Sequence, residues 1–231
     1  STASRWRRRP ATSTTASQIF KRCDGVAEAP PGGRSDGTAT LKRPALVGPP
    51  MSEDYAERLR ANRREKDEFF DDHPQSPIPP EHRDDFDGLD YFPPDPDYRV
   101  EATVTVHDDP DPVEMETTAS NPVRYLRIVT FAFEIDGAEH TLAGYRQEGD
   151  DGAIFVPFRD KTTGQQTYHR GRYMELAPER DLDDGDAVTI DFNLAYSPFC
   201  AYSETFSCPL PPEENWLEIV IPAGERSPNL D

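Results

Sequence analysis

The chain has few of the residues that most often identify a catalytic or metal-binding protein from sequence. Its 231 residues include three cysteines, none of them in C-x-x-C spacing, and five scattered histidines. The glycines follow neither the G-x-x-x-x-G-K nor the G-x-G-x-x-G phosphate-binding pattern. Because metal ligands need a defined spacing, the sequence predicts no metal site and no cofactor.

Long apolar runs are also missing. Apolar residues make up 35% of the chain, and the mean hydropathy is −0.79. The first fifty residues are rich in Ser, Thr, Gly, Pro and Ala and show no apolar periodicity. The sequence therefore predicts no signal peptide and no membrane contact, and we expect a cytoplasmic protein.

Charge divides the chain near residue 50. Residues 1–50 hold nine Lys or Arg against three acids, a balance of +6 within a total of −19, which leaves residues 51–231 at −25. A step in charge marks a boundary. Residues 1–50 are either a disordered basic arm that contacts anions or nucleic acid, or upstream sequence read from a wrong start, with Met51 the true first residue. We favour the second interpretation, with residues 51–231 forming a single domain.

Lysine is scarce in the acidic part of the chain, where Lys66 and Lys161 are the two that follow Met51. Clustered acids of this kind repel one another and are relieved by salt. This composition is typical of salt-loving archaea, so we expect an acidic, salt-adapted surface. It also argues against nucleic acid as a partner of the folded part, because phosphate binding needs a positive patch.

The hydrophobic pattern predicts one helix and many strands. Ser52 is suited to cap a helix that ends near Pro74, and residues 74–97 predict a Pro-rich extended wrap. From Val100 the period changes to two, and Asp136-Gly137 indicates a hairpin. We expect further strands at 154–158, 172–176, 187–192 and 216–221. The predicted fold is mainly β: an antiparallel sandwich or a partly open barrel, with one N-terminal α-helix.

Strand alternation places one charged side chain inside. Arg172 shares its parity with Met174 and Leu176, so it points into the core, where it needs a carboxylate such as Asp160 or Asp191. We expect a site that binds a small anionic ligand, or a protein partner, with tyrosines as walls. The predicted ligand-binding residues are Arg159, Asp160, Tyr168, Arg172, Tyr173, Asp191, Asn193 and Tyr196.

Two alternatives stay open for these polar residues. A hydrolase would use Asp160 and Asp191, or Glu225, as paired carboxylates. A structural or scaffold protein would instead use the Arg–Asp cluster to pin the loop 162–171 and the strand ends.

The two cysteines of the acidic part are eight positions apart. Cys200 and Cys208 predict a redox-sensitive pair or two packed thiols in a reducing compartment. A Cys200 nucleophile with His169 as its base is a further catalytic hypothesis.

A long ordered set of residues resembles a known family. It begins with Phe69-Phe70, Ser76-Pro77 and Tyr91-Phe92-Pro93, and continues through Phe158-Arg159-Asp160 and Gly171-Arg172-Tyr173. Its later parts are Asp191-Phe192-Asn193, Cys208-Pro209-Leu210-Pro211-Pro212 and Ala223-Gly224-Glu225. From about Tyr55 to Arg226 the chain is similar to the DUF1684 family of uncharacterised proteins. The resemblance implies no activity, because no reaction is established for that family.

Overall fold

The computed structural model describes residues 52–119 and 121–228, so the predictions for residues 1–50 and for Met51 lie outside the described residues. The described chain begins with helix α1 (Glu53–Asp72). The strands are β1 (Arg99–Met115), β2 (Val123–Ile135), β3 (Ala138–Arg146), β4 (Ile154–Phe158), β5 (Arg172–Leu176) and β6 (Ala187–Asp191). Short 3-10 helices are η3 (Pro80–Asp85), η4 (Pro96–Tyr98), η5 (Phe192–Leu194), η6 (Phe199–Ala201) and η7 (Glu213–Asn215).

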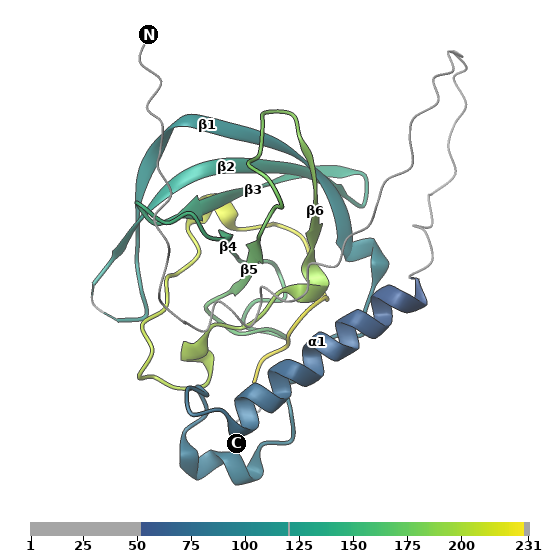
Figure 1. Cartoon of the computed structure of the whole chain (residues 1–231), viewed down its shortest axis with the longest axis vertical. Helices are drawn as coiled ribbons and strands as arrows, with labels where there is room; N and C mark the ends of the chain where they lie inside the picture. The colour runs from purple at the N-terminus through teal and green to yellow at the C-terminus, as the bar shows by residue number, and fades with distance from the viewer. Residues whose placement is uncertain (1–51, 120, 229–231) are drawn as a thin grey trace. The chain divides into compact units, whose positions relative to one another are not determined.

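The six strands form one sheet in the order β5-β4-β3-β2-β1-β6. Every neighbouring pair is antiparallel. The long strands β1 and β2 arch over the shorter ones, and the sheet curls into a half-barrel (Figure 1). The predicted mainly β fold with one N-terminal helix is therefore confirmed, in its partly open barrel form.

The hairpin between β2 and β3 forms where the sequence predicts it. Asp136 has φ 54° and Gly137 has φ 76°. Two positive φ values in a row suit the two-residue turn that matches the twist of the flanking strands. The turn sets the register, which pairs Ile135 with Ala138 and continues to Leu126 and Arg146.

A bulge divides the apolar residues of β2 between the two faces of the sheet. The pairing of β2 with β3 shifts register between Arg127 and Val129. An extra residue in one strand turns the following side chains to the other face. Tyr125 therefore packs with Met115 in a small cluster, whereas Val129 and the residues after it join the main core.

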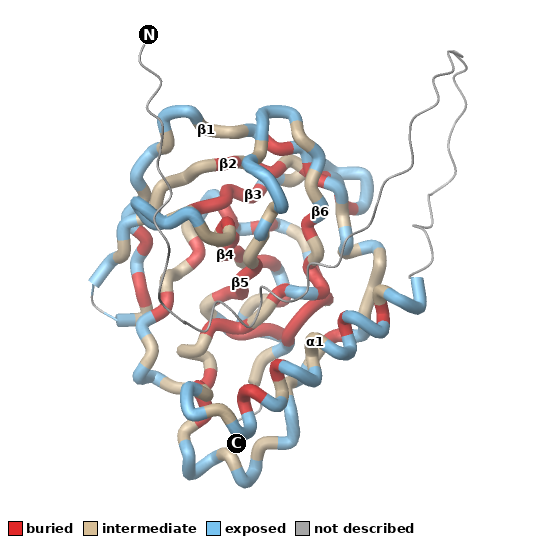
Figure 2. The backbone as a smooth tube through the Cα atoms, in the orientation of Figure 1, coloured by how far each residue is buried: buried red, intermediate tan, exposed pale blue. Residues whose placement is uncertain are grey.

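The core lies inside the curl of the sheet, where Figure 2 shows buried stretches beside intermediate ones. Strands β2 and β4 contribute Phe131, Phe133, Val156 and Phe158 to it. Phe192 follows β6 and packs edge-on against Phe158, with ring centroids 5.5 Å apart. Aromatic burial of this kind dominates the stability of a small core.

Helix α1 begins and ends as its sequence predicts. The Ser52 side chain accepts a hydrogen bond from the Tyr55 amide, and the His73 amide closes the last turn on the Phe69 carbonyl. The Pro-rich segment then runs back along α1, with the Leu89 amide donating to Asp67. The predicted wrap is thus present and is tied to the helix that it follows.

Two strand predictions differ from the structure. Strand β1 continues to Met115, well past Val106, because the pairing with β2 shifts register between Val106 and Asp111 and then resumes. The predicted strand at 216–221 is wrong, since that segment pairs at a single bridge between Trp216 and Arg159. The Ile221 amide bonds to the Asp160 carboxylate instead of a strand carbonyl, so the ladder stops.

Candidate functional site

Arg172 is buried at the first residue of β5, as the strand alternation predicts. Its Nη2 lies 3.2 Å from Asp160 Oδ1, and both side chains are 0% exposed. The two terminal nitrogens also donate to the carbonyls of Ile221, Ala223 and Glu225. Burial lowers the pKa of Arg172, and the neighbouring carboxylate of Asp160 opposes that shift. The predicted carboxylate partner is therefore Asp160, not Asp191.

Asp160 has further partners that hold the loop after β4. Its Oδ2 accepts hydrogen bonds from the Ile221 amide at 2.8 Å and from the Thr162 amide at 3.2 Å. The Thr162 hydroxyl donates to the same carboxylate at 2.9 Å. A buried carboxylate with this many donors is well compensated for its lost hydration.

Asp191 lies at the end of β6 with a different set of partners. It accepts hydrogen bonds from the Tyr55 hydroxyl at 2.6 Å and from the Asn193 amide at 3.0 Å. Within the described part of the chain, no group bonds to both Asp160 and Asp191. The structure thus gives no geometric support to a carboxylate pair of the kind that hydrolysis requires.

Asn193 is 1% exposed and joins β6 to the extended segment before β1. Its side-chain oxygen accepts from the Asp95 amide at 2.8 Å, and its nitrogen donates to the Asp95 carbonyl at 2.7 Å. An amide that satisfies both backbone groups of one residue acts like a strand partner. Its bonding capacity is spent inside the protein.

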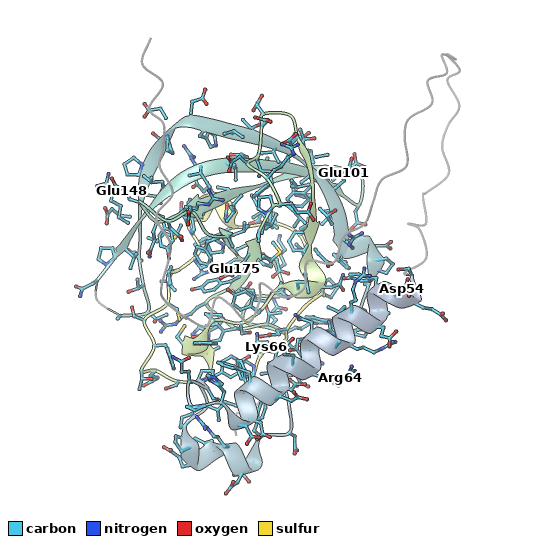
Figure 3. The ribbon with its side chains drawn as sticks, viewed as in Figure 1. Asp54, Arg64, Lys66, Glu101, Glu148 and Glu175 are labelled. Carbon is cyan, nitrogen blue, oxygen red and sulfur yellow. The ribbon has the colours of Figure 1, made fainter. Side chains whose placement is uncertain are left out.

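A second buried ion pair was missed from the sequence. Lys66 on α1 pairs with Glu225, and their side chains are 7% and 2% exposed. The other carboxylate oxygen of Glu225 accepts from the Ser197 amide and the Tyr202 hydroxyl. In Figure 3, Lys66 and Arg64 lie on opposite sides of α1, with Lys66 on the side toward the sheet. The sequence signal for the burial of Lys66 was its position on the apolar stripe of α1, between Leu59 and Phe70.

We call Lys66, Asp160, Arg172, Asn193 and Glu225 the buried polar cluster. The tyrosines predicted as ligand walls also bond to the protein itself. Tyr173 donates to the Pro209 carbonyl, Tyr196 to Glu175, and Tyr168 to the Cys200 carbonyl. Burial raises the pKa of Tyr173 and of Tyr196, so these hydroxyls stay neutral donors. The cluster and its tyrosines connect the sheet, α1 and the C-terminal segment.

Arg159 differs from the buried cluster because it reaches the surface. Its guanidinium lies 4.8 Å from the ring centroid of Trp216, which is 44% exposed. Lys161 pairs with Glu218 on the same side, at 2.8 Å. We call these residues, together with half-exposed Val220, the Arg159–Trp216 face.

The Arg159 guanidinium has no hydrogen-bond or ion-pair partner among residues 52–119 and 121–228, and its Nε is buried without one. The backbone of Arg159 is nevertheless fixed, because its amide donates to the Asn215 carbonyl and its carbonyl accepts from the Leu217 amide. The face therefore combines a fixed backbone with a cation whose donors are unused.

Cys200 and Cys208 lie together as free thiols. The Cys200 amide is 3.3 Å from Cys208 Sγ, and the Tyr168 hydroxyl is 3.7 Å from Cys200 Sγ. The ring of His169 lies edge-on to that of Tyr168, and its Nε2 accepts a hydrogen bond from Arg170 Nε. Tyr168 thus approaches Cys200, and no hydrogen bond joins Cys200 to His169 within the described part of the chain.

The described residues also offer neither a metal-binding cluster nor a membrane-spanning helix. Among the described residues, no three side chains of His, Cys, Asp or Glu come together in a way that could hold a metal ion. No helix in that same part of the chain is long and apolar enough to cross a membrane.

Fold and site together define a small antiparallel half-barrel with one helix, which a buried ion pair ties to the C-terminal segment. The chain belongs to the family described as a protein of unknown function, DUF1684, which it matches over residues 84–226. It is similar to the solution NMR structure of an uncharacterized protein from Haloarcula marismortui, with 63% sequence identity and a TM-score of 0.61. That match covers 75% of this chain and 95% of the other. No curated protein matches the sequence.

Proposed function

We propose that this protein is a binding domain whose ligand or partner presents an anionic group to the Arg159–Trp216 face. The observation that carries the proposal is the guanidinium of Arg159, which stacks on a half-exposed Trp216 and has unused donors. A guanidinium held over an aromatic ring presents a planar fork that suits a carboxylate or a phosphate.

The charge of the surroundings sharpens the choice of ligand. Residues 51–231 carry a net charge of −25, so a polyanion such as nucleic acid is repelled over most of the surface. A small molecule or a single acidic side chain of a partner meets Arg159 there, beside a Lys161 that is already paired with Glu218. We therefore narrow the proposed ligand to one that presents a single carboxylate or phosphate group. We propose that the protein itself is cytoplasmic and salt-adapted.

The test is a thermal-shift screen of the full chain in molar salt, against metabolites with carboxylate or phosphate groups. Arg159→Gln removes the charge on the face, and Arg64→Gln removes an exposed charge on the outer side of α1 as a matched control. Ligands at about 100 times their Kd add roughly 2.7 kcal/mol to the free energy of unfolding. We expect wild type and Arg64→Gln to gain this stability equally.

Arg159→Gln should keep its fold and lose the gain. A ligand that stabilises Arg159→Gln as strongly as wild type would overturn the proposal.

A scaffold role is the second candidate, and the buried polar cluster favours it. The terminal nitrogens of Arg172, the amide of Asn193 and the carboxylate of Glu225 all bond within the protein. If no anionic ligand shifts the wild-type melting temperature, this role stands and the search moves to protein partners.

A further inference from the structure

The second feature of the structure with reactive groups is the pair of free thiols near η6, Cys200 and Cys208. Cys200 is partly exposed within η6, whereas Cys208 is 8% exposed. The Cys208 Sγ accepts a hydrogen bond from the Cys200 amide nitrogen at 3.3 Å. The backbone of one cysteine thus contacts the sulfur of the other, and the two lie eight positions apart, so a disulfide between them would close a short loop.

The surroundings of Cys200 favour its thiolate. The largest influence on the pKa of Cys200 is the hydrogen bond from Cys208, which lowers it. Burial raises the pKa, whereas hydrogen bonds from Tyr168 and Thr118 and the charge of Arg170 lower it further. Together they lower the pKa of the Cys200 thiol to about 7. The thiolate is the reactive form of cysteine, so the lowered pKa makes Cys200 more reactive near neutral pH than an ordinary thiol.

Cys208 has the opposite character. Donation to Cys200 and burial both raise the pKa of the Cys208 thiol, so it stays protonated. The segment that carries it is fixed, since the Cys208 amide donates to the Thr118 hydroxyl and its carbonyl accepts from the Thr118 amide. One thiol is thus an accessible nucleophile and the other a protected, positioned partner.

Further titratable groups of the described chain act on the pair. Tyr168 and Arg170 approach it from the loop before β5, Tyr173 from β5 itself and Tyr125 from β2. Burial raises the pKa of each of these tyrosines above its ordinary value. Among the described groups that face the pair, Cys200 is therefore the one that titrates near neutral pH.

We propose that Cys200 and Cys208 form a peroxide-reactive dithiol site, in which Cys200 is oxidised first and Cys208 resolves it to an intrachain disulfide. This site is independent of the Arg159–Trp216 face. The exposed and buried positions of the two sulfurs set the order of the steps.

The chemistry balances with hydrogen peroxide as the oxidant. The Cys200 thiolate attacks one peroxide oxygen, a sulfur–oxygen bond forms, the oxygen–oxygen bond breaks and hydroxide leaves. Sulfur loses two electrons and peroxide gains them. The Cys208 sulfur, giving up its proton, then attacks the Cys200 sulfur, and the sulfur–oxygen bond breaks as the second hydroxide takes that proton to become water.

The new bond would close the loop that contains Tyr202. Phe199 and Tyr202 pack on Phe70 of α1, with ring centroids 6.0 and 4.8 Å away. Tyr202 also donates to Glu225. Closing this loop removes freedom from the unfolded chain, so we expect the oxidised protein to melt at a higher temperature than the reduced protein.

The test treats the reduced full chain with hydrogen peroxide at pH 7, blocks remaining thiols with an alkylating reagent and maps the peptides by mass spectrometry without reduction. Cys23 is the internal control, because it offers a third thiol outside the described residues. We expect a Cys200–Cys208 cross-linked peptide, with Cys23 alkylated. We expect Cys200 to react roughly tenfold faster than in urea-unfolded protein.

Variants separate the roles of the two sulfurs. Cys208→Ser should leave a sulfenic acid on Cys200, trapped by a dimedone-type reagent, and Cys200→Ser should leave Cys208 unreacted. In Cys23→Ser the cross-link should form as in wild type. Cys200 reacting no faster than Cys23, or a cross-link that joins Cys23 to either partner instead, would overturn the proposal even if a variant fails to fold.

The pH profile tests the same assignment by another route. Because the thiolate reacts, the rate should rise with pH, reach half its plateau near pH 7 and change little above pH 8. Tyr168→Phe removes one donor to the thiolate, so its midpoint should move to higher pH while the disulfide still forms. A wild-type midpoint near the ordinary thiol pKa of about 8.5 would contradict the assignment.

Discussion

Arg159 and Arg172 stand at the two ends of one loop and have opposite environments. Arg172 is completely buried, and both of its terminal nitrogens bond to backbone carbonyls or to Asp160. Arg159 stacks on Trp216 at the surface with its donors unused. Residue type and neighbouring sequence therefore do not distinguish an arginine that supports the fold from one that is available for binding. Solvent access and the partners of the terminal nitrogens do, because the Nε of each arginine is buried without a hydrogen-bond partner.

The same contrast extends to the carboxylates and thiols. Glu225 is spent on Lys66, Ser197 and Tyr202, although its sequence position makes it an attractive catalytic acid. Cys200 is the partly exposed residue of the thiol pair, and Cys208 is the buried one. Function in this fold is therefore expected where a reactive group meets water, outside the buried polar cluster.

The largest loss of stability is expected when the buried arginine, Arg172, is replaced. Arg172→Met leaves the Asp160 carboxylate buried without its cation, which costs about 3–5 kcal/mol in free energy of unfolding. Urea denaturation in molar salt measures it directly. Arg64→Met is the matched control on the exposed side of α1, where a cost within about 0.5 kcal/mol is expected. Equal costs at the two positions would mean that the Arg172–Asp160 pair is not structural.

An intermediate effect is expected at the glycine that brings the C-terminal segment to the cluster. Gly224 has φ +79°, and an added Cβ would lie 2.5 Å from the Ala195 carbonyl oxygen and 2.7 Å from that of Phe192. Gly137 has φ +76° but nothing within 4 Å. Gly137→Ala should cost about 1–2 kcal/mol for the left-handed backbone.

Gly224→Ala should cost about 3 kcal/mol or more, since a backbone clash adds to the same strain. The difference between the two variants in urea denaturation isolates the clash. A Gly224→Ala protein as stable as Gly137→Ala would show that the two carbonyls move aside easily.

The smallest loss of stability is expected when the solvent-accessible arginine, Arg159, is replaced. Arg159→Gln removes one stacking contact with Trp216, which contributes about 1 kcal/mol or less at an exposed site. Its effect on ligand stabilisation should nevertheless be complete. A variant that unfolds as readily as Arg172→Met would place Arg159 with the architecture and remove the distinction between the two arginines.

Local sequence signals predicted much of the fold. Ser52 caps α1, Asp136-Gly137 turns the β2–β3 hairpin, and alternation along β5 directs Arg172 inward. Each signal acts within a few residues, so a single sequence contains it. The bulge after Arg127 escaped prediction because it depends on how two strands register against one another.

The site was less accessible to sequence reasoning. Parity along β5 placed Arg172 in the core and offered Asp160 as its partner, and the short spacing placed Cys200 near Cys208. Lys66 could not be connected to Glu225, because the two are separated by 159 positions and meet through α1 and the last segment of the chain. The predicted strand at 216–221 failed for a related reason, since Asp160 takes the Ile221 amide.

By itself, the sequence determined the acidic charge, the family, the mainly β class and the inward direction of Arg172. Tertiary structure alone decided which polar groups are spent and which remain open to solvent. The physical reason is that a buried charge must find partners wherever the folded chain brings them. Those partners lie on elements far apart in sequence, as Lys66 and Glu225 do, whereas periodicity reports only on neighbours within one element.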